Sequence, residues 1–283
     1  MSEEGGWSPL ELVRWTTAYF RGHGVETPRL DAEVLLSHVL GGLRIDLYLG
    51  FEKTVPEAAR ARYRDLIRRR AIDREPVAYL TGKREFWSQT LHVGPGALVP
   101  RPETEGVVEA VLELAPQRLL DVGTGCGAIA CAVGLKLETV QVVALDRSLD
   151  ALRVARENVE RLGLEGRVHL VAADLLEPLG FRAGVIAANL PYVPTAELSS
   201  LPPEVHHEPS LALNGGVDGL EVVRRLIRDA PRHLEPGGAV VLEVGPGHAP
   251  TVGALLRSVG AIDVETRGDL AGMERVVVGR FGG

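Results

Sequence analysis

Short apolar runs alternate with helical patterns from residue 118 to the end of this chain. The first five runs alternate with helices, as a parallel doubly wound sheet requires. The last two leave no room for a good helix between them, so we expect an antiparallel pair at the sheet edge. The runs cover residues 118–122, 140–145, 168–172, 184–188 and 239–244, followed by 261–264 and 275–278.

The part of the chain before these runs has a different pattern. Apolar residues recur at three- and four-residue spacing in segments 30–39 and 63–71, which is typical of helices. From Phe86 to Val93 the residues alternate up to a Gly-Pro-Gly turn, as expected of a strand or hairpin that connects two domains. We therefore expect a helical domain over residues 1–84, a linker with a β-hairpin over 85–105, and an α/β domain over 106–283.

Composition and charge exclude several classes of protein. With 45% hydrophobic and 24% charged residues, the chain has the composition of an ordinary globular protein. Its net charge of −7 disfavours broad binding to nucleic acid, so no direct nucleic-acid contact is expected. We expect no secretory signal, because residues 1–5 include no basic residue and no apolar stretch. We also expect no membrane span, because no apolar run approaches the ~20 residues that one needs. The chain has two cysteines, Cys126 and Cys131, which lie five positions apart, and this is unlike a disulfide scaffold. We therefore expect a cytoplasmic protein.

A glycine-rich loop follows the first apolar run, from Asp121 to Gly127. Glycines at alternate positions let the backbone turn sharply and approach a ligand, and the next helix offers free N–H groups. Asp146 ends the second run, where a carboxylate can hold ribose hydroxyls in NAD and S-adenosylmethionine sites alike. Asp121 and Gly127 favour S-adenosylmethionine, whose charged amino-acid end needs polar partners. A purely structural turn is the less favoured alternative.

Two further positions bear on the cofactor site. We expect Asp174 and Leu175, after the third run, to border the adenine, although Asp174 is nearly as well explained as a helix N-cap. Cys126 resembles a nucleophile at a helix N-terminus, but its loop position favours a small packing residue. The expected cofactor-binding residues are Asp121, Gly123, Thr124, Gly125, Cys126, Gly127, Asp146, Asp174, Leu175 and Asn189.

The fourth run ends in Asn189-Leu190-Pro191-Tyr192, which we call the Asn189–Tyr192 corner. An amide or aromatic amino nitrogen is a poor nucleophile because its lone pair is delocalised. The Asn189 side-chain carbonyl and the Leu190 main-chain carbonyl can accept the two N–H bonds of such a group. Pro191 keeps Leu190 extended, and Tyr192 can stack on a flat substrate. We therefore expect Asn189, Pro191 and Tyr192 to be catalytic and all four residues to bind substrate; an ordinary strand-to-loop turn is the alternative.

No metal site is expected in the chain. His206, His207 and Glu208 are adjacent and flanked by prolines, and neighbouring histidines in such a segment rarely chelate one ion. Methyl transfer to a positioned nitrogen requires neither a metal nor a covalent nucleophile.

Several other motifs lie outside the loop and the corner, at residues 31–36, 75–82, 99–105, 208–209, 213–219 and 269–272. With them, the chain resembles the release-factor N(5)-glutamine methyltransferases (the HemK/PrmC family) over nearly its whole length. The glycine loop is common to many methyltransferases, whereas the helical and linker motifs are far more specific.

The resemblance implies a class I S-adenosylmethionine-dependent methyltransferase fold preceded by a small all-helical domain. It implies methylation of the glutamine in the Gly-Gly-Gln motif of class I peptide release factors, supporting translation termination. The cofactor roles fall on residues 123–127, Asp146 and Asp174-Leu175, and the glutamine role on the Asn189–Tyr192 corner. Leu190 departs from the usual Asn-Pro-Pro-Tyr, and Leu175 replaces a residue that is often aromatic.

Other functions remain open at this stage. They are a ribosomal-protein glutamine methyltransferase, a nucleic-acid amino-group methyltransferase, and a non-catalytic S-adenosylmethionine-binding partner of the translation machinery. We expect the helical domain to dock the release factor, since segment 60–74 carries seven arginines. A solvated helix face is the favoured explanation of those arginines taken alone.

Overall fold

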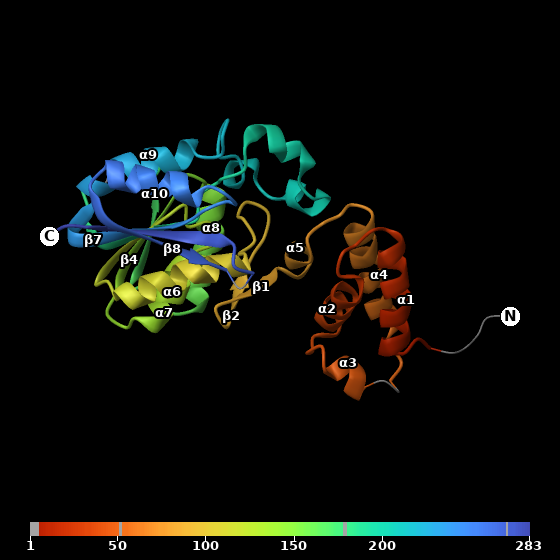
Figure 1. The fold of residues 1–283 in the computed structure, drawn as a ribbon. Coiled ribbons are helices and arrows are strands. Elements are labelled where there is room, and N and C mark those ends of the chain that lie inside the picture. Colours follow the sequence, from red (N-terminus) through yellow and green to blue (C-terminus); the bar gives the residue numbers. More distant parts are fainter. Residues whose placement is uncertain (1–5, 51–52, 178–179, 270) are drawn as a thin grey trace. The chain divides into compact units, whose positions relative to one another are not determined.

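The computed structural model describes residues 6–50, 53–177, 180–269 and 271–283 (Figure 1). It divides into two compact units. One comprises Met1–Gly82 together with Pro203–His207, and the other Lys83–Pro202 together with Glu208–Gly283. The first is called the helical unit and the second the sheet unit. That a short segment far along the chain joins the helical unit was not predicted from the sequence.

The helical unit is built from amphipathic helices around a small core. Ser8 and Glu11 form a reciprocal capping box that begins α1, and Gly41 at φ 74° ends α2. Phe20, Leu35 and Tyr63 are almost completely buried. The helices are α1 (Pro9–Gly22), α2 (Pro28–Leu40), α3 (Asp46–Leu49), α4 (Glu57–Ala71) and α5 (Val77–Thr81), with the 3₁₀ segment η3 (Pro203–His207).

The sheet unit begins with the expected hairpin. Strands β1 (Lys83–Phe86) and β2 (Gln89–His92) pair antiparallel, so the hairpin is present but begins before Phe86. Trp87 and Ser88 form its turn with φ of 50° and 58°, a left-handed conformation that non-glycine residues adopt at some cost. Glu105 accepts a hydrogen bond from the Trp87 N–H at 2.9 Å, which helps to hold this turn.

A seven-stranded sheet forms the core of this unit, in the order β5-β4-β3-β6-β7-β9-β8. Strands β3 to β7 are parallel, and β9 pairs antiparallel with both β7 and β8, which confirms the predicted terminal pair. The strands are β3 (Arg118–Val122), β4 (Gln141–Asp146), β5 (Val168–Ala172), β6 (Ala183–Ala188), β7 (Leu234–Glu243), β8 (Ala261–Gly268) and β9 (Glu274–Phe281).

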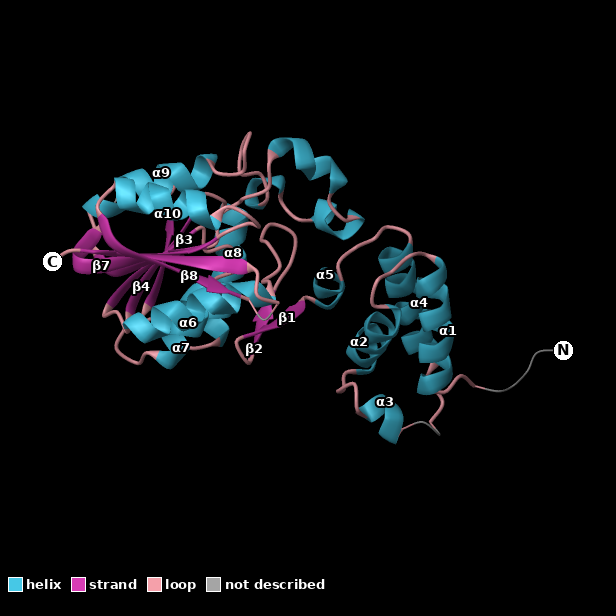
Figure 2. Cartoon of the chain, in the orientation of Figure 1, coloured by secondary structure: helices cyan, strands magenta, loops and turns pink. Residues whose placement is uncertain are grey.

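Helices cover both faces of the sheet, with α9 and α10 on one face and α6 and α7 on the other (Figure 2). The strands are therefore buried on both sides and read as continuous apolar runs. The helices of this unit are α6 (Glu105–Leu114), α7 (Ala128–Lys136), α8 (Leu149–Arg161), α9 (Glu221–Asp229) and α10 (Ala249–Ser258). Short 3₁₀ segments are η1 (Pro102–Thr104), η2 (Thr195–Ser200), η4 (Ser210–Ala212) and η5 (Ala230–Arg232).

The connection from β5 to β6 differs from the prediction. We expected each of the first five runs to alternate with a helix, but no helix begins among the described residues between Ala172 and Ala183. Asp174 and Glu177 instead form an isolated antiparallel bridge, and Leu175 has φ of 58°. The connection is too short for a helix with a loop at each end, since a complete crossover usually takes a dozen residues or more.

The order of the strands reverses at β3, which has β4 on one side and β6 on the other. In open α/β sheets ligands bind at such a reversal, outside the carboxyl ends of the strands. The loops after β3, β4 and β6 begin there. Within the described part of the chain, no helix is both long and apolar enough to cross a membrane.

Candidate active site

A cavity of about 150 Å³ lies at the carboxyl ends of β3, β4 and β6, inside the sheet unit. The structure brings most of the predicted site residues to its walls. Three do not line it, namely Asp121, Gly127 and Tyr192. Those that do are Gly123, Thr124, Gly125, Cys126, Asp146, Asp174, Leu175, Asn189, Leu190 and Pro191.

The glycine loop is held against the sheet by its own backbone. The N–H groups of Gly123 and Thr124 both donate to the Leu145 carbonyl, at 2.8 and 2.9 Å. Gly123 has φ of 73°, and a Cβ there would lie 3.0 Å from Leu190 Cδ2. The loop therefore packs closely on the buried Leu190 side chain, which only a residue without Cβ allows at this φ.

Asp121 supports the loop from beneath. Its side chain is completely buried, and Oδ2 accepts hydrogen bonds from the Thr124 hydroxyl at 2.6 Å and the Ala130 N–H at 3.1 Å. Burial raises the pKa of this carboxyl to about 6, although both hydrogen bonds act in the opposite direction. Asp121 thus fixes the start of the loop and the first turn of α7 rather than lining the cavity.

Asp146 does line the cavity. One carboxylate oxygen accepts the Gly125 N–H and the other the Ser148 N–H, each at 2.9 Å. Burial raises the pKa of this carboxyl, and the two backbone hydrogen bonds counteract the increase. Each oxygen has two lone pairs, so each keeps acceptor capacity for a hydroxyl group in the cavity.

Cys126 has the environment of a packing residue. It is 2% exposed, and burial raises the pKa of its thiol to about 12. A thiol of that kind is not a nucleophile at neutral pH. Its main-chain carbonyl accepts a hydrogen bond from Asn158 Nδ2 at 2.9 Å, which ties the loop to α8.

Asp174 and Leu175 lie just beyond the end of β5. Asp174 pairs with Arg225 of α9 at 2.7 Å, and both side chains are partly exposed. The alternative explanation of Asp174 as a helix N-cap is wrong, because the described residues that follow it form a turn and a bridge. Leu175 reaches the cavity wall from a left-handed backbone conformation, which a single sequence does not reveal.

Asn189 is half-buried on the cavity wall, at the end of β6. Its Nδ2 donates a hydrogen bond to the Thr104 hydroxyl at 3.0 Å, and Thr104 donates to Glu243 Oε2 at 2.6 Å. Neither Thr104 nor Glu243 was identified from the sequence as a site residue. Thr104 lies within the linker motif 99–105, which was the available signal, whereas Glu243 is only the next-to-last residue of the apolar run 239–244.

Tyr192 follows the corner residues that line the cavity but does not itself line it. A Cβ on Gly245 would come within 2.9 Å of its ring, so the ring packs on the backbone after β7. Burial is the main reason that its pKa is raised. The predicted stacking of Tyr192 on a substrate stays a prediction.

The segment around Asn214 supports the corner. The Val193 N–H donates to the Leu213 carbonyl at 3.0 Å, and the Gly215 N–H donates back to the Val193 carbonyl at 2.9 Å. A Cβ on Gly215 would lie 2.7 Å from the Pro191 carbonyl oxygen. The glycines of motif 213–219 are therefore needed because backbone packs on backbone there.

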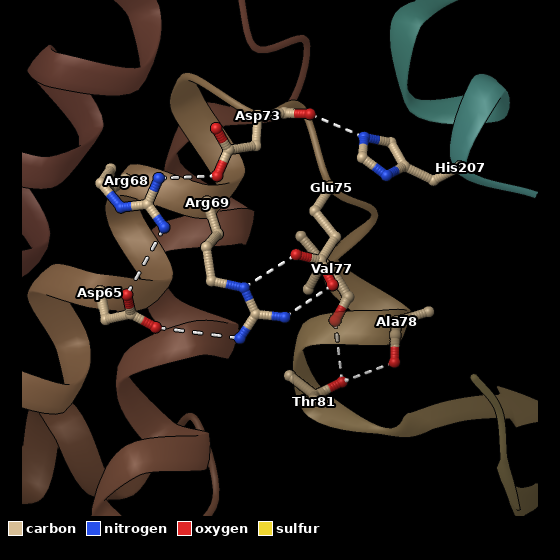
Figure 3. A network of polar contacts seen from close by, with 9 residues as sticks. All are labelled: Asp65, Arg68, Arg69, Asp73, Glu75, Val77, Ala78, Thr81 and His207. Carbon is tan, nitrogen blue, oxygen red and sulfur yellow. Dashed lines mark hydrogen bonds and ion pairs between the residues drawn. The ribbon is translucent and has the colours of Figure 1, made fainter. Parts of the chain in front are cut away.

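The segment His206–Glu208 has partners other than a metal. Glu208 accepts the Val99 N–H at 2.9 Å and pairs with Arg101, which holds the linker motif in the sheet unit. In the helical unit, His207 Nε2 lies 2.6 Å from the Asp73 carbonyl oxygen (Figure 3). Among the described residues, no group of three or more histidine, cysteine or acidic side chains is placed to hold a metal ion.

Comparison with known proteins gives consistent matches. A family model described as the PrmC N-terminal domain matches residues 11–82, and one described as the methyltransferase small domain matches residues 103–200. A release factor glutamine methyltransferase of Rhodopirellula baltica is 41% identical over 98% of this chain and 97% of its own length. One of Geobacter sulfurreducens is 42% identical over 98% of each chain.

Solved structures share the fold at low sequence identity. The hMettl16 catalytic domain, solved with an RNA hairpin, has a TM-score of 0.58 at 17% identity, covering 80% of this chain and 83% of its own. A Thermus thermophilus 16S rRNA methyltransferase, solved with AdoMet and guanosine, has a TM-score of 0.52 at 18% identity, covering 70% of this chain and 49% of its own. These likenesses establish a class I methyltransferase sheet.

Proposed function

Because the chain belongs to the release factor glutamine methyltransferase family, we propose that it methylates the side-chain nitrogen of the glutamine in the Gly-Gly-Gln motif of class I peptide release factors, with S-adenosylmethionine as methyl donor. The observation that carries the proposal is the placement of Asn189. Its amide lies on the wall of the cavity that the glycine loop and Asp146 also line, and its nitrogen is engaged by Thr104. The amide oxygen is left to accept a substrate N–H.

The residues of the cavity fit S-adenosylmethionine. Asp146 keeps free lone pairs for the ribose hydroxyls, and a Cβ on Gly125 would meet no atom within 4 Å, so open space lies beside the loop backbone. Leu175 offers an apolar contact to the adenine. S-adenosylmethionine would supply a methyl group attached to a sulfonium, which makes the methyl strongly electrophilic. The protein's contribution is to hold the acceptor nitrogen in line with that methyl.

We assign the positioning of the glutamine to the Asn189–Tyr192 corner. The Asn189 Oδ1 and the Leu190 carbonyl accept the two N–H bonds of the amide, which directs its lone pair towards the methyl. The Leu190 side chain is 5% exposed and packs under Gly123, away from this task. Leucine at this position therefore keeps the main-chain carbonyl, and its side chain packs against the glycine loop.

The helical unit is proposed to dock the release factor, but not through an open basic patch. The arginines of α4 are largely paired with carboxylates of the same unit. Arg69 forms two hydrogen bonds to Glu75, at 2.7 and 2.8 Å, and Arg68 pairs with Asp73 at 2.8 Å (Figure 3). The seven arginines of segment 60–74 therefore give the docking proposal less support than their number suggests. The proposal rests on the separate helical unit, which matches a family model of the PrmC N-terminal domain.

The proposal is tested with tritiated S-adenosylmethionine and separate purified acceptors, namely a class I release factor, ribosomal proteins and ribosomal RNA. We expect label on the release factor alone. Label on a ribosomal protein or on RNA, with none on the release factor, would support one of the alternative methyltransferases. Docking by the helical unit predicts a much lower KM for the intact release factor than for a short Gly-Gly-Gln peptide; equal KM values would contradict it.

A further inference from the structure

Three polar side chains form a continuous chain of hydrogen bonds that ends at the cavity. Asn189 Nδ2 donates to Thr104 Oγ1 at 3.0 Å, and Thr104 Oγ1 donates to Glu243 Oε2 at 2.6 Å. Thr104 is 4% exposed and Glu243 is 3% exposed, whereas Asn189 reaches the cavity. The three residues come from η1, the end of β7 and the end of β6, which the sheet unit brings together.

The acceptor at the inner end gives this chain of bonds a direction. An ionised carboxylate can only accept, so the Thr104 hydroxyl must give its single proton to Glu243. The Thr104 oxygen then has only lone pairs to offer Asn189, so Asn189 must present its NH₂ group. Its carbonyl oxygen consequently faces the other way. Two buried side chains thus select one of the two possible orientations of the Asn189 amide.

A buried carboxylate needs a reason to be present. Glu243 ends β7 among apolar strands, and burying a carboxylate with few hydrogen bonds is unfavourable. Burial raises its pKa to about 7, the nearby charge of Glu103 adds to this, and Thr104, Arg275 and Arg101 oppose it. Tyr192 also lies near, since the charge of Glu243 contributes to raising the Tyr192 pKa. An apolar residue would suit the site better if packing were its only role.

We propose that Thr104 and Glu243 are positioning residues, which orient the Asn189 amide so that its carbonyl oxygen accepts from the substrate nitrogen. This inference rests on the proposed role of Asn189 in methyl transfer. If Glu243 becomes neutral, it can donate to Thr104, and Thr104 can then donate to the Asn189 oxygen. The amide would turn its NH₂ group towards the substrate NH₂ group, where donor faces donor.

Protonation of Glu243 should therefore lower turnover. The pKa of Glu243 is about 7, so kcat is expected to rise as the pH increases through about 7 and to level off above it. Thr104→Val removes the hydroxyl but keeps the shape, and Thr104→Ser restores the hydroxyl. Glu243→Gln is uncharged at every pH and can turn either its NH₂ group or its carbonyl towards Thr104. It therefore no longer selects one orientation of the Asn189 amide, and it should lose activity together with this limb of the pH profile.

The test measures kcat and KM for a class I release factor, the Kd for S-adenosylmethionine by calorimetry, and the thermal midpoint. For Thr104→Val and Glu243→Gln we expect kcat to fall about 10- to 100-fold, because small displacements of a positioning group cost this much, with Kd changed less than about threefold. Thr104→Ser should recover most of the turnover. Glu105→Gln is the matched control, because its carbonyl can still accept the Trp87 N–H, and should behave as wild type.

An unchanged kcat in Thr104→Val would overturn the inference, as would a Thr104→Ser variant as slow as Thr104→Val. A Glu243→Gln variant that keeps the limb near pH 7 would also overturn it. Should Thr104→Val fail to fold, Thr104→Ser and the pH profile of Glu243→Gln decide the matter. Failure of the proposed function can be distinguished from failure of this inference, because in the former case the wild-type protein itself would leave the release factor unlabelled.

Discussion

Removing the Asn189 side chain separates catalysis from binding. Asn189→Ala deletes the oxygen that we assign to the reacting amide and leaves the Thr104 hydroxyl without its donor at 3.0 Å. Losing one well-placed group in a reacting site costs roughly 2.7–4 kcal/mol, which corresponds to about 10²- to 10³-fold in kcat. The lost hydrogen bond itself should cost only about 1 kcal/mol of unfolding free energy, because water in the cavity can replace the donor.

The assay compares single-turnover methylation of the release factor, S-adenosylmethionine affinity by calorimetry, and the midpoint of thermal unfolding. We expect the large loss in the rate alone. Asn158→Ala is a useful contrast, since Asn158 is 1% exposed and holds the Cys126 carbonyl, so its loss should reduce stability as well as affinity. Equal losses of rate and affinity in Asn189→Ala would mean that Asn189 mainly holds the cofactor or the fold.

Three further predictions test the supporting structure, and two of them include a control substitution. Arg70→Met should destabilise the helical unit by about 3–5 kcal/mol in thermal unfolding, because Arg70 is buried and bonds Asp31 and Glu204 at 2.7 and 2.8 Å. Arg64→Met removes one partner of the exposed Arg64–Glu57 pair and should change the free energy of unfolding by less than about 1 kcal/mol. Equal destabilisation by Arg64→Met and Arg70→Met would contradict this reasoning. Gly123→Ala should weaken S-adenosylmethionine binding about tenfold, through a left-handed φ costing about 1–2 kcal/mol and the contact with Leu190. Gly163 has φ of 66° with no atom within 4 Å of an added Cβ, so Gly163→Ala should lower stability but leave the affinity for S-adenosylmethionine unchanged. A loss of that affinity in Gly163→Ala would refute the argument. Because the pKa of Glu243 is raised to about 7, its carboxyl is protonated more readily in the folded state, so its contribution to stability is lost as the pH increases from about 4.5 to about 7. Relative to wild type, Glu243→Gln should therefore gain roughly 3 kcal/mol in denaturant unfolding over that range, and a constant difference would contradict the burial of a titrating carboxyl.

Much of the sheet could be predicted because its strands are determined by patterns within short stretches of the sequence. A strand covered on both faces must be apolar throughout, so β3, β4 and β6 stand out as runs, and the short spacing of β8 and β9 requires an antiparallel pair. The β5–β6 connection was predicted wrongly, because periodicity alone does not show that a turn with Leu175 in a left-handed conformation replaces a helix.

The parts of the site that were missed depend on contacts between distant residues. Asn189 and Thr104 are separated by 85 positions, and Thr104 and Glu243 by 139, so no local pattern links them. The same holds for Arg70 and Glu204, which are 134 positions apart and place segment Pro203–His207 in the helical unit. The linker motif was recognisable as a family feature, but its role follows only from the folded structure.

Localisation of the methyl group by fragment mass spectrometry tests the central claim most directly. A purified class I release factor is treated with the protein and S-adenosylmethionine, alongside a release factor whose Gly-Gly-Gln glutamine is replaced by alanine. Our account predicts one added methyl group on the side-chain nitrogen of that glutamine and none on the alanine variant. A methyl group at another position, or equal modification of the alanine variant, would contradict it.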